Sequence, residues 1–365
     1  MKKKIIFFMP SIEGGGVEKN LFLLSNFLSP KLNITIITAD NFSKKKFSNK
    51  VNFISPKSNF FYKKKKYLKY LICLFLLFKE FLKNKNIAVF SFQANIYAIL
   101  FAKLLGLKII TRSNTSPSGW SSNFIKFLIF KKVLKFSDLI IVNSQEFKKQ
   151  MENKFKVKCK LILNPLNLNT IVNKSNEKLN FSFFNKNSLN LINVARLTDQ
   201  KDHLTLLKAI KILSEKINIK LLILGSGVNK NKINNFIIKN RLKENIKLLS
   251  FQSNPYKFIK RADILVLSSS YEGLPNVLLE GIALKKFIIA SNCPTGPKEI
   301  LNNGKLGFLF KVGSEEELVI KILKYLKLKK KCKKMISNSF KNLNKYDFNK
   351  NCNIYYDCIK KYLLN

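Results

Sequence analysis

The sequence has only one histidine, His203, and its six cysteines stand apart from one another. It contains no Cys-x-x-Cys pair and no Cys/His cluster, which are the spacings typical of zinc sites. We therefore predict no zinc site. We also expect the cysteines to be free thiols, as in a reducing compartment.

Long hydrophobic runs are also missing. The longest is Leu71–Phe78, LICLFLLF, and the apolar run after the first lysines, Ile5–Met9, stops at Pro10. A helix needs about 20 apolar residues to cross a bilayer, and a signal peptide needs a longer apolar stretch than the second run offers. We expect neither a membrane-spanning helix nor a signal peptide.

Acidic residues are few, with 21 Asp and Glu against 67 Lys and Arg and a net charge of +46. Such a charge favours polyanions: nucleic acid, nucleotide phosphates or an anionic membrane surface. A dedicated nucleic-acid-binding protein concentrates basic and aromatic residues in one surface motif. Here lysines are spread over both halves, so nucleic-acid binding is kept only as an alternative, and general enrichment in lysine accounts for part of the charge.

The 365 residues suffice for two α/β domains. Strand-like and helix-like segments alternate along both halves, which is typical of doubly wound parallel sheets. Segment 164–188 is rich in Asn and Ser and lacks periodicity, so it reads as a connection. We predict two Rossmann-like lobes facing a cleft, with these boundaries: 1–165 for the first lobe, 166–188 for a linker, 189–345 for the second lobe, and 346–365 for a helix that returns to the first lobe.

Two glutamates in SSSYEGLPNVLLE, Glu272 and Glu280, are the most informative residues. They flank a predicted strand-to-helix turn in which Asn276 caps a helix from Val277 to about Leu284. Unpaired N–H groups at a helix start attract phosphate, and a carboxylate accepts hydrogen bonds from vicinal hydroxyls. The pattern indicates a ligand with a phosphate and a polyhydroxylated part, unless both acids are simply solvated.

Four further elements follow predicted strands. Arg196 and Lys201 would form a cationic clamp for a diphosphate, or would be two ordinary surface cations. The turn Gly225–Gly227 lets a ligand approach the backbone, and Gly14–Gly16 precedes a helix whose start can receive phosphate. The segment Cys293–Glu299 is either a ligand loop or a structural turn.

Together these elements resemble the family-four retaining glycosyltransferases that use nucleotide sugars and have the GT-B fold. The matching stretches are GGGVEKN, the Arg196/Lys201 pair, GSG, and SSSYEGLPNVLLE with FIIASNCPTGPKEIL. The resemblance extends over nearly the whole chain and is most specific in the second lobe. It implies an acceptor site mostly in the first lobe and a donor site mostly in the second.

The resemblance also implies residue roles. Arg196 and Lys201 would bind the donor diphosphate, Glu272 the sugar hydroxyls and Glu280 the ribose, so the catalytic set would be Glu272, Arg196 and Lys201. The cation pair and the helix start would replace a metal, and the only small molecule required would be a nucleoside-diphosphate sugar, UDP-linked or other. The donor-binding positions would be Gly14, Gly15, Gly16, Gly225, Gly227, Gly273, Leu274, Asn276, Val277 and Glu280.

Many members of this family have a histidine in the first lobe that faces the donor sugar, but His203 lies in the second lobe. The loop beginning at Thr111 would then offer Arg112 or Asn114 to the sugar. No side chain stands out as a nucleophile. Retention would depend on stabilising the leaving group, whose phosphate oxygen would deprotonate the acceptor.

The turn at Cys293 is similar to that of members that transfer hexoses or N-acetylhexosamines to lipid-linked or surface-polysaccharide precursors. Segment 63–83, an apolar helix flanked by lysines, fits docking on an anionic inner leaflet beside a lipid-diphosphate acceptor, although a core helix with solvated lysines fits equally. We expect a cytoplasmic protein peripheral to the membrane. A sugar-nucleotide epimerase of the same fold is the alternative enzyme.

Overall fold

The computed structural model describes residues 3–12, 14–57, 65–114 and 123–364. The chain divides into two compact units. Unit 1 contains Met1–Pro165 and Phe348–Asn365, and unit 2 contains Leu166–Asp347. Both units are α/β and each is built on a parallel sheet, as the alternation of strands and helices predicts.

Unit 1 has a seven-stranded sheet in the order β3-β2-β1-β4-β5-β6-β7. All its strand pairs are parallel, and β1 lies between β2 and β4, with Ile5 opposite Ile34 and Ala88. The strands are short and apolar because helices cover both faces. Their bounds are β1 Lys4–Phe8, β2 Asn33–Ile37, β3 Asn52–Ile54, β4 Ile87–Ser91, β5 Ile109–Arg112, β6 Leu139–Val142 and β7 Cys159–Leu161.

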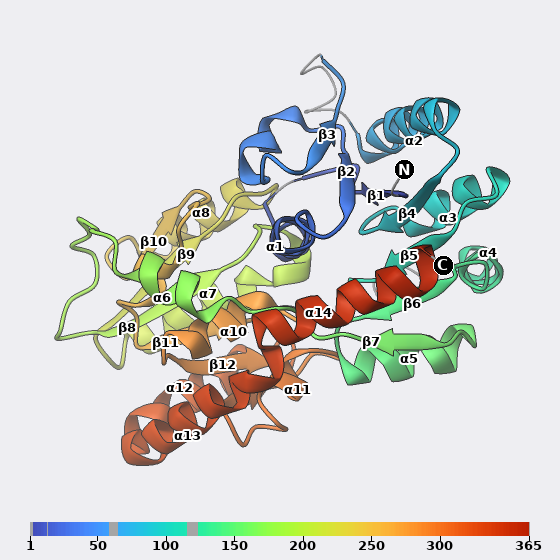
Figure 1. The fold of residues 1–365 in the computed structure, drawn as a ribbon. Coiled ribbons are helices and arrows are strands. Elements are labelled where there is room, and N and C mark those ends of the chain that lie inside the picture. Colours follow the sequence, from blue (N-terminus) through green and yellow to red (C-terminus); the bar gives the residue numbers. More distant parts are fainter. Residues whose placement is uncertain (1–2, 13, 58–64, 115–122, 365) are drawn as a thin grey trace. The chain divides into compact units, whose positions relative to one another are not determined.

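The helices of unit 1 form two layers (Figure 1). Helix α1 (Gly16–Leu28) and the C-terminal α14 (Phe348–Ile359, red) pack in one apolar core with alternate side chains of β1. The other core contains the inward residues of four helices. These are α2 (Lys66–Lys83), α3 (Asn95–Leu104), α4 (Phe124–Leu134) and α5 (Gln145–Phe155).

Unit 2 has a six-stranded parallel sheet in the order β10-β9-β8-β11-β12-β13. Its strands are β8 Leu189–Val194, β9 Ile219–Leu224, β10 Ile246–Leu249, β11 Ile264–Leu267, β12 Phe287–Ser291 and β13 Phe308–Phe310. Its helices are α6 Leu168–Ser175, α7 His203–Ser214, α8 Lys230–Lys239, α9 Tyr256–Ile259, α10 Asn276–Ala283, α11 Pro297–Ile300, α12 Glu315–Lys327 and α13 Lys329–Lys341. Unit 2 is therefore a second doubly wound fold.

Segment 166–188 differs from its expected role as a plain linker. It contains helix α6, which contacts α9 and α10, and it belongs to unit 2. The helix was missed because its few apolar side chains lie among Asn, Thr and Lys. The last helix, α14, belongs to unit 1 and contacts α1.

Within the described part of the chain, no helix is both long and apolar enough to cross a membrane.

Candidate functional site

The predicted donor site of unit 2 lies where the strand order reverses. Strand β8 pairs with β9 on one side and with β11 on the other. The chain therefore adds β9 and β10 on one side of β8, and then β11, β12 and β13 on the other side. Open parallel sheets bind ligands at such a switch point, outside the carboxyl ends of the strands. Arg196 and Lys201 follow the end of β8, and Glu272 follows the end of β11. The topology therefore brings these predicted site residues to one edge of the sheet.

Lys201 and Glu272 form an ion pair across this edge, from Nζ to Oε1. Their side chains are only 14% and 8% exposed, so water screens the pair little. Arg196 lies on the exposed part of the same connection. The sequence predicted that Lys201 and Glu272 contact the same ligand, but it did not predict that they contact each other.

Hydrogen bonds to backbone carbonyls hold these two connections together. The Ser270 N–H donates to the Gln200 carbonyl at 2.8 Å, and the Gln200 side-chain amide donates to the Tyr271 carbonyl at 2.9 Å. The Ser268 hydroxyl donates to the Lys201 carbonyl at 2.9 Å. These bonds fix the backbone on both sides of the ion pair, which is how a rigid scaffold positions binding side chains.

The turn Gly225–Gly227 has a packing role that the sequence did not predict. A Cβ atom at Gly225 would lie 1.9 Å from the Ala195 carbonyl oxygen, and one at Gly227 would lie 2.4 Å from the Leu197 carbonyl oxygen. The Leu197 N–H also donates to the Ser226 carbonyl at 2.9 Å. The glycines thus allow this turn to pack directly on the backbone that carries Arg196. Their predicted contact with the donor stays a prediction.

Helix α10 begins one residue earlier than predicted, because Pro275 takes the N-cap position and Asn276 is the first helical residue. The predicted donor-binding residues Gly273 and Leu274 form the turn before it, and Val277 lies in its first turn. Glu280, one turn further on, is 6% exposed, as is Glu272. The alternative of two solvated surface acids is therefore wrong.

The end of β12 and the segment that follows it stabilise the Glu272 turn by hydrogen bonds. The Thr295 hydroxyl donates to the Glu272 carbonyl, and the Ser291 hydroxyl donates to the Ser269 carbonyl at 2.5 Å. Gly296 has φ +82°, and a Cβ atom there would lie 2.2 Å from the Gly273 carbonyl oxygen. Of the two interpretations of segment 293–299, the structure supports the structural turn.

In unit 1, the predicted glycine loop also follows the strand at which the order reverses, between β1 and β4. Gly14 has φ +86°, Gly15 is the N-cap of α1, and Gly16 begins the helix. The carboxylate of Glu18 occupies this helix start, since a Cβ atom at Gly15 would lie 2.9 Å from its Oε2. A carboxylate stabilises a helix start as a phosphate does. Phosphate binding by this loop stays a prediction.

An ion pair that the sequence did not indicate lies beside the chain that leads into this loop. Lys69 of α2 contacts Asp40 at 2.8 Å, with side chains 5% and 0% exposed, and Asp40 accepts from the Ile12 N–H at 2.7 Å. Lys69 also donates to the Ser11 hydroxyl at 3.2 Å. The ion pair therefore holds the residues that immediately precede the glycine loop. Residues so far apart in sequence give no local signal of such a contact.

Arg112 and Asn114, the suggested sugar-facing residues, are held within unit 1. Arg112 is 1% exposed and donates to the Tyr355 hydroxyl of α14 at 2.8 Å, to Asn164 Oδ1 at 2.6 Å and to Asn114 Oδ1. Asn114 in turn donates to the Phe92 carbonyl at 2.9 Å. Arg112 therefore ties the C-terminal helix to the sheet, and its suggested role at a sugar stays a prediction.

His203, the first residue of α7, is 3% exposed. Burial, assisted by the charge of Lys201, lowers the pKa of its imidazole to about 4. Neither ring nitrogen has a hydrogen-bond partner within the described part of the chain. His203 is therefore neutral at physiological pH and belongs to the core.

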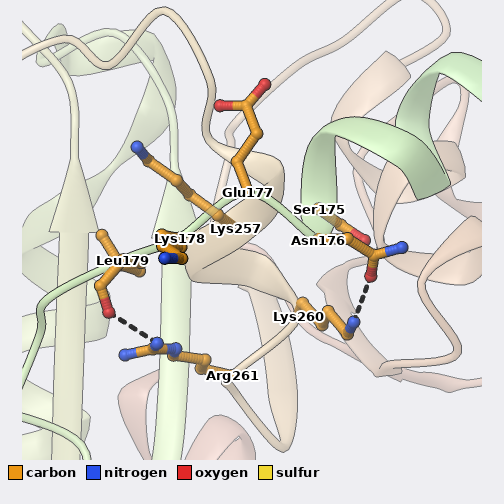
Figure 2. A pocket seen from close by; sticks show the side chains of 8 residues that line it. All are labelled: Ser175, Asn176, Glu177, Lys178, Leu179, Lys257, Lys260 and Arg261. Carbon is orange, nitrogen blue, oxygen red and sulfur yellow. Dashed lines mark hydrogen bonds between the residues drawn. The ribbon is translucent and has the colours of Figure 1, made fainter.

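A depression of about 340 Å³ lies elsewhere in unit 2, and Figure 2 shows its lining. Arg261 donates to the Leu179 carbonyl at 2.6 Å, and Lys260 donates to Asn176 Oδ1. Both cations precede β11, so they lie at the sheet edge opposite Glu272. This depression is separate from the predicted site, and its contacts attach the chain after α6 to α9.

Comparison with known proteins identifies the family. The family model described as glycosyl transferases group 1 matches residues 174–342. Residues 174–342, in the C-terminal half of the chain, therefore match the group 1 glycosyltransferase family. An uncharacterized glycosyltransferase of Methanocaldococcus jannaschii is 40% identical over 198 residues, which are 52% of this chain and 49% of that protein. The match thus spans about half the length of that relative.

Two other similarities cover most of the chain. One relative is the N-acetylgalactosamine-N,N'-diacetylbacillosaminyl-diphospho-undecaprenol 4-alpha-N-acetylgalactosaminyltransferase of Campylobacter jejuni. It is 29% identical over 334 residues, which are 87% of this chain and 88% of that protein. Anabaena HepE in complex with UDP and glucose has a TM-score of 0.79 at 15% identity, and covers 98% of this chain and 100% of its own. The fold is GT-B, as the resemblance implied.

Proposed function

We propose that the protein transfers a hexose or an N-acetylhexosamine from a nucleoside-diphosphate sugar to a lipid-linked or polysaccharide acceptor, with retention of configuration. The observation that carries the proposal is the buried Lys201–Glu272 pair beside Arg196 at the switch point of unit 2. The names of the C. jejuni relative and the Anabaena structure support a lipid-diphosphate acceptor and a uridine nucleotide.

The residues of this site suit the chemistry. Arg196 and Lys201 supply fixed positive charge to a diphosphate, which is the leaving group of such a transfer. The start of α10 offers N–H groups to the same anion. Buried carboxylates such as Glu272 and Glu280 hold hydroxyl groups well because little water competes for them. Metal-independence stays a prediction, and excess chelator should leave turnover unchanged.

Turnover with a labelled sugar nucleotide and a polyprenyl-diphosphate acceptor tests the proposal. The expected products are a nucleoside diphosphate and an elongated lipid whose new linkage has the donor's anomeric configuration by NMR. Glu272→Gln should lower turnover about a hundredfold or more, because a site built to bind hydroxyls loses its strongest acceptor. Glu315→Gln, which removes the acid of the exposed Lys208 pair in the same unit, is the matched control.

Two outcomes would oppose the proposal. Conversion of the sugar nucleotide into another without any acceptor would favour the epimerase. Sequence-selective binding of nucleic acid at physiological salt, without turnover, would favour the alternative of a nucleic-acid-binding protein. Salt-dependent binding alone decides nothing, since any strongly cationic surface shows it.

A further inference from the structure

Helix α2 of unit 1 has a buried face and, opposite it, an exposed apolar face. The residues that face the sheet are Lys69, Cys73, Leu77 and Glu80, all buried. A second stripe, Leu68, Leu71, Phe75, Phe78 and Leu82, is 37–63% exposed. At about 100° per residue, the two stripes lie on opposite sides of the helix. A helix that only covers a core has polar residues on that outer side.

The neighbouring helix α3 repeats this arrangement. Its buried residues are Ala98, Ile99 and Ala102, whereas Tyr97, Leu100 and Leu104 are 44%, 43% and 83% exposed. Aromatic rings join the two helices, because Tyr97 lies 5.6 Å from Tyr70 and Phe101 lies 6.5 Å from Phe78, between ring centroids.

Helix α4, which contacts α3, extends the exposed apolar surface. Phe124, Ile125, Leu128 and Ile129 are 71%, 66%, 42% and 47% exposed. The buried residues of the three helices belong to one core against one face of the sheet, so the opposite residues of each helix point away from that face. We call the exposed apolar residues of α2, α3 and α4 the outer face. Single exposed apolar residues are ordinary, but a set spread over three adjacent helices marks an interaction surface.

The three helices of the outer face carry many lysines and a single acidic residue. Beside them, Asp138 pairs with Lys103 of α3 at 2.8 Å. Between Asp40 and Asp138 the only acidic residue is Glu80. Glu80 is buried and paired with Lys4 and Lys83 at 2.9 Å each, so it adds no free negative charge. The exposed lysines of α2 and α4 include Lys79 and Lys126. The Lys79 ammonium lies 4.6 Å from the centre of the Phe75 ring, at the border of the apolar stripe.

We propose that the outer face docks unit 1 on an anionic lipid bilayer. Leu and Phe side chains would enter the boundary between headgroups and acyl chains, while the long lysine side chains reach the phosphates. A protein partner of ordinary polarity would not require so many lysines beside the apolar residues, whereas an anionic leaflet attracts them. The inference does not depend on the transfer reaction, and its test needs no substrate.

Vesicle flotation of the full chain tests the inference. The probes are vesicles of phosphatidylcholine with phosphatidylglycerol, and vesicles of phosphatidylcholine alone. We expect binding to the first and at least about tenfold weaker partitioning to the second, because each lysine near an anionic surface contributes to attraction. Binding to neither type of vesicle would overturn the proposal.

Matched variants separate the outer face from the general charge of the chain. Serine at Leu71, Phe75 and Leu82 removes apolar surface from the outer face, and serine at Val228, Ile238 and Ile320 removes equally exposed apolar residues from unit 2. We expect the first triple variant to lower partitioning about tenfold or more, and the second to change it less than about twofold. Equal effects of the two triple variants, or none, would overturn the proposal.

A lysine comparison tests the electrostatic part. Glutamine at Lys79, Lys126 and Lys132 should weaken binding more than glutamine at Lys330, Lys333 and Lys334 of α13, although both sets are exposed and carry the same charge. Equal losses would show that only the net charge of the chain matters. A dimer in the absence of lipid that the outer-face serine variant abolishes, together with no vesicle binding, would instead assign the face to a second copy of the chain.

Discussion

The Lys201–Glu272 pair should stabilise unit 2 as well as bind its ligand. Lys201→Met keeps most of the side-chain volume and removes the charge. Both partners are less than about one-sixth exposed (14% and 8%), so the carboxylate left behind gains little solvation from water. Removing one partner of a buried pair typically costs about 3–5 kcal/mol. Because this pair lies at the sheet edge, we predict the lower end, about 3 kcal/mol.

Lys208 provides the comparison. It pairs with Glu315 at 2.9 Å in the same unit, but its side chain is 47% exposed, and exposed pairs contribute little to stability. Urea unfolding followed by far-UV circular dichroism measures both. Lys201→Met should lower the free energy of unfolding several-fold more than Lys208→Met does.

A double variant separates charge from packing. Lys201→Met with Glu272→Gln should lose less than the sum of the single losses, because the second change removes the unpaired charge that the first creates. If Lys201→Met costs no more than Lys208→Met, or if the losses simply add, the pair is not the electrostatic element described above.

Three further predictions concern the surroundings of the site and the C-terminal helix. Gly225→Ala should cost at least about 2 kcal/mol in unfolding free energy, because its Cβ would lie 1.9 Å from the Ala195 carbonyl oxygen. Tyr355→Phe should cost about 1–3 kcal/mol in the same assay, because it leaves the buried Arg112 Nε–H without its acceptor. Burial lowers the pKa of His203 to about 4, so as the pH falls the imidazole is protonated in the unfolded chain before it is protonated in the folded one. The contribution of the neutral His203 to the free energy of unfolding should be fully present above about pH 6.5 and should fall by up to about 3 kcal/mol as the pH drops to 4.

Each of these predictions has its own control. Gly106→Ala meets no atom within 4 Å, so it should cost only the strain of its positive φ of +69°. Tyr356→Phe alters the neighbouring, half-buried ring and should be nearly neutral. His203→Gln should flatten the stability profile between pH 6.5 and 4. Unchanged acid sensitivity in that variant, or equal losses within either of the other two pairs, would contradict the reasoning.

The sequence was sufficient for the regular parts of the fold. The alternation of strand-like and helix-like segments predicts both parallel sheets, and α2 lies within the apolar segment 63–83 that was predicted as a helix. The three-residue strands β3, β7 and β13 were missed, because so short a segment has no readable alternation. Helix α13 was missed because dense lysine hides the spacing of its buried residues Cys332, Met335 and Ser339.

The candidate site was predictable as a set of residues but not as a geometry. Lys201 and Glu272 are 71 positions apart, and no local pattern reports that their side chains meet. Gly225 was attributed to ligand approach, whereas the atom nearest to its missing Cβ belongs to the chain's own backbone. Contacts of this kind depend on how strands are ordered in the sheet, which periodicity along the chain does not encode.

The central claim is that the edge of unit 2 beside Arg196 binds the diphosphate of a sugar nucleotide. Calorimetric titration with UDP, GDP and ADP measures this most directly, using the tightest of the three to compare Arg196→Ala with Arg241→Ala, a second exposed arginine of the same unit. A charged hydrogen bond to phosphate contributes about 1.5–3 kcal/mol, so Arg196→Ala should weaken binding about 10- to 100-fold and Arg241→Ala should not. Binding of none of the three nucleotides, or equal affinity in the two variants, would contradict the account.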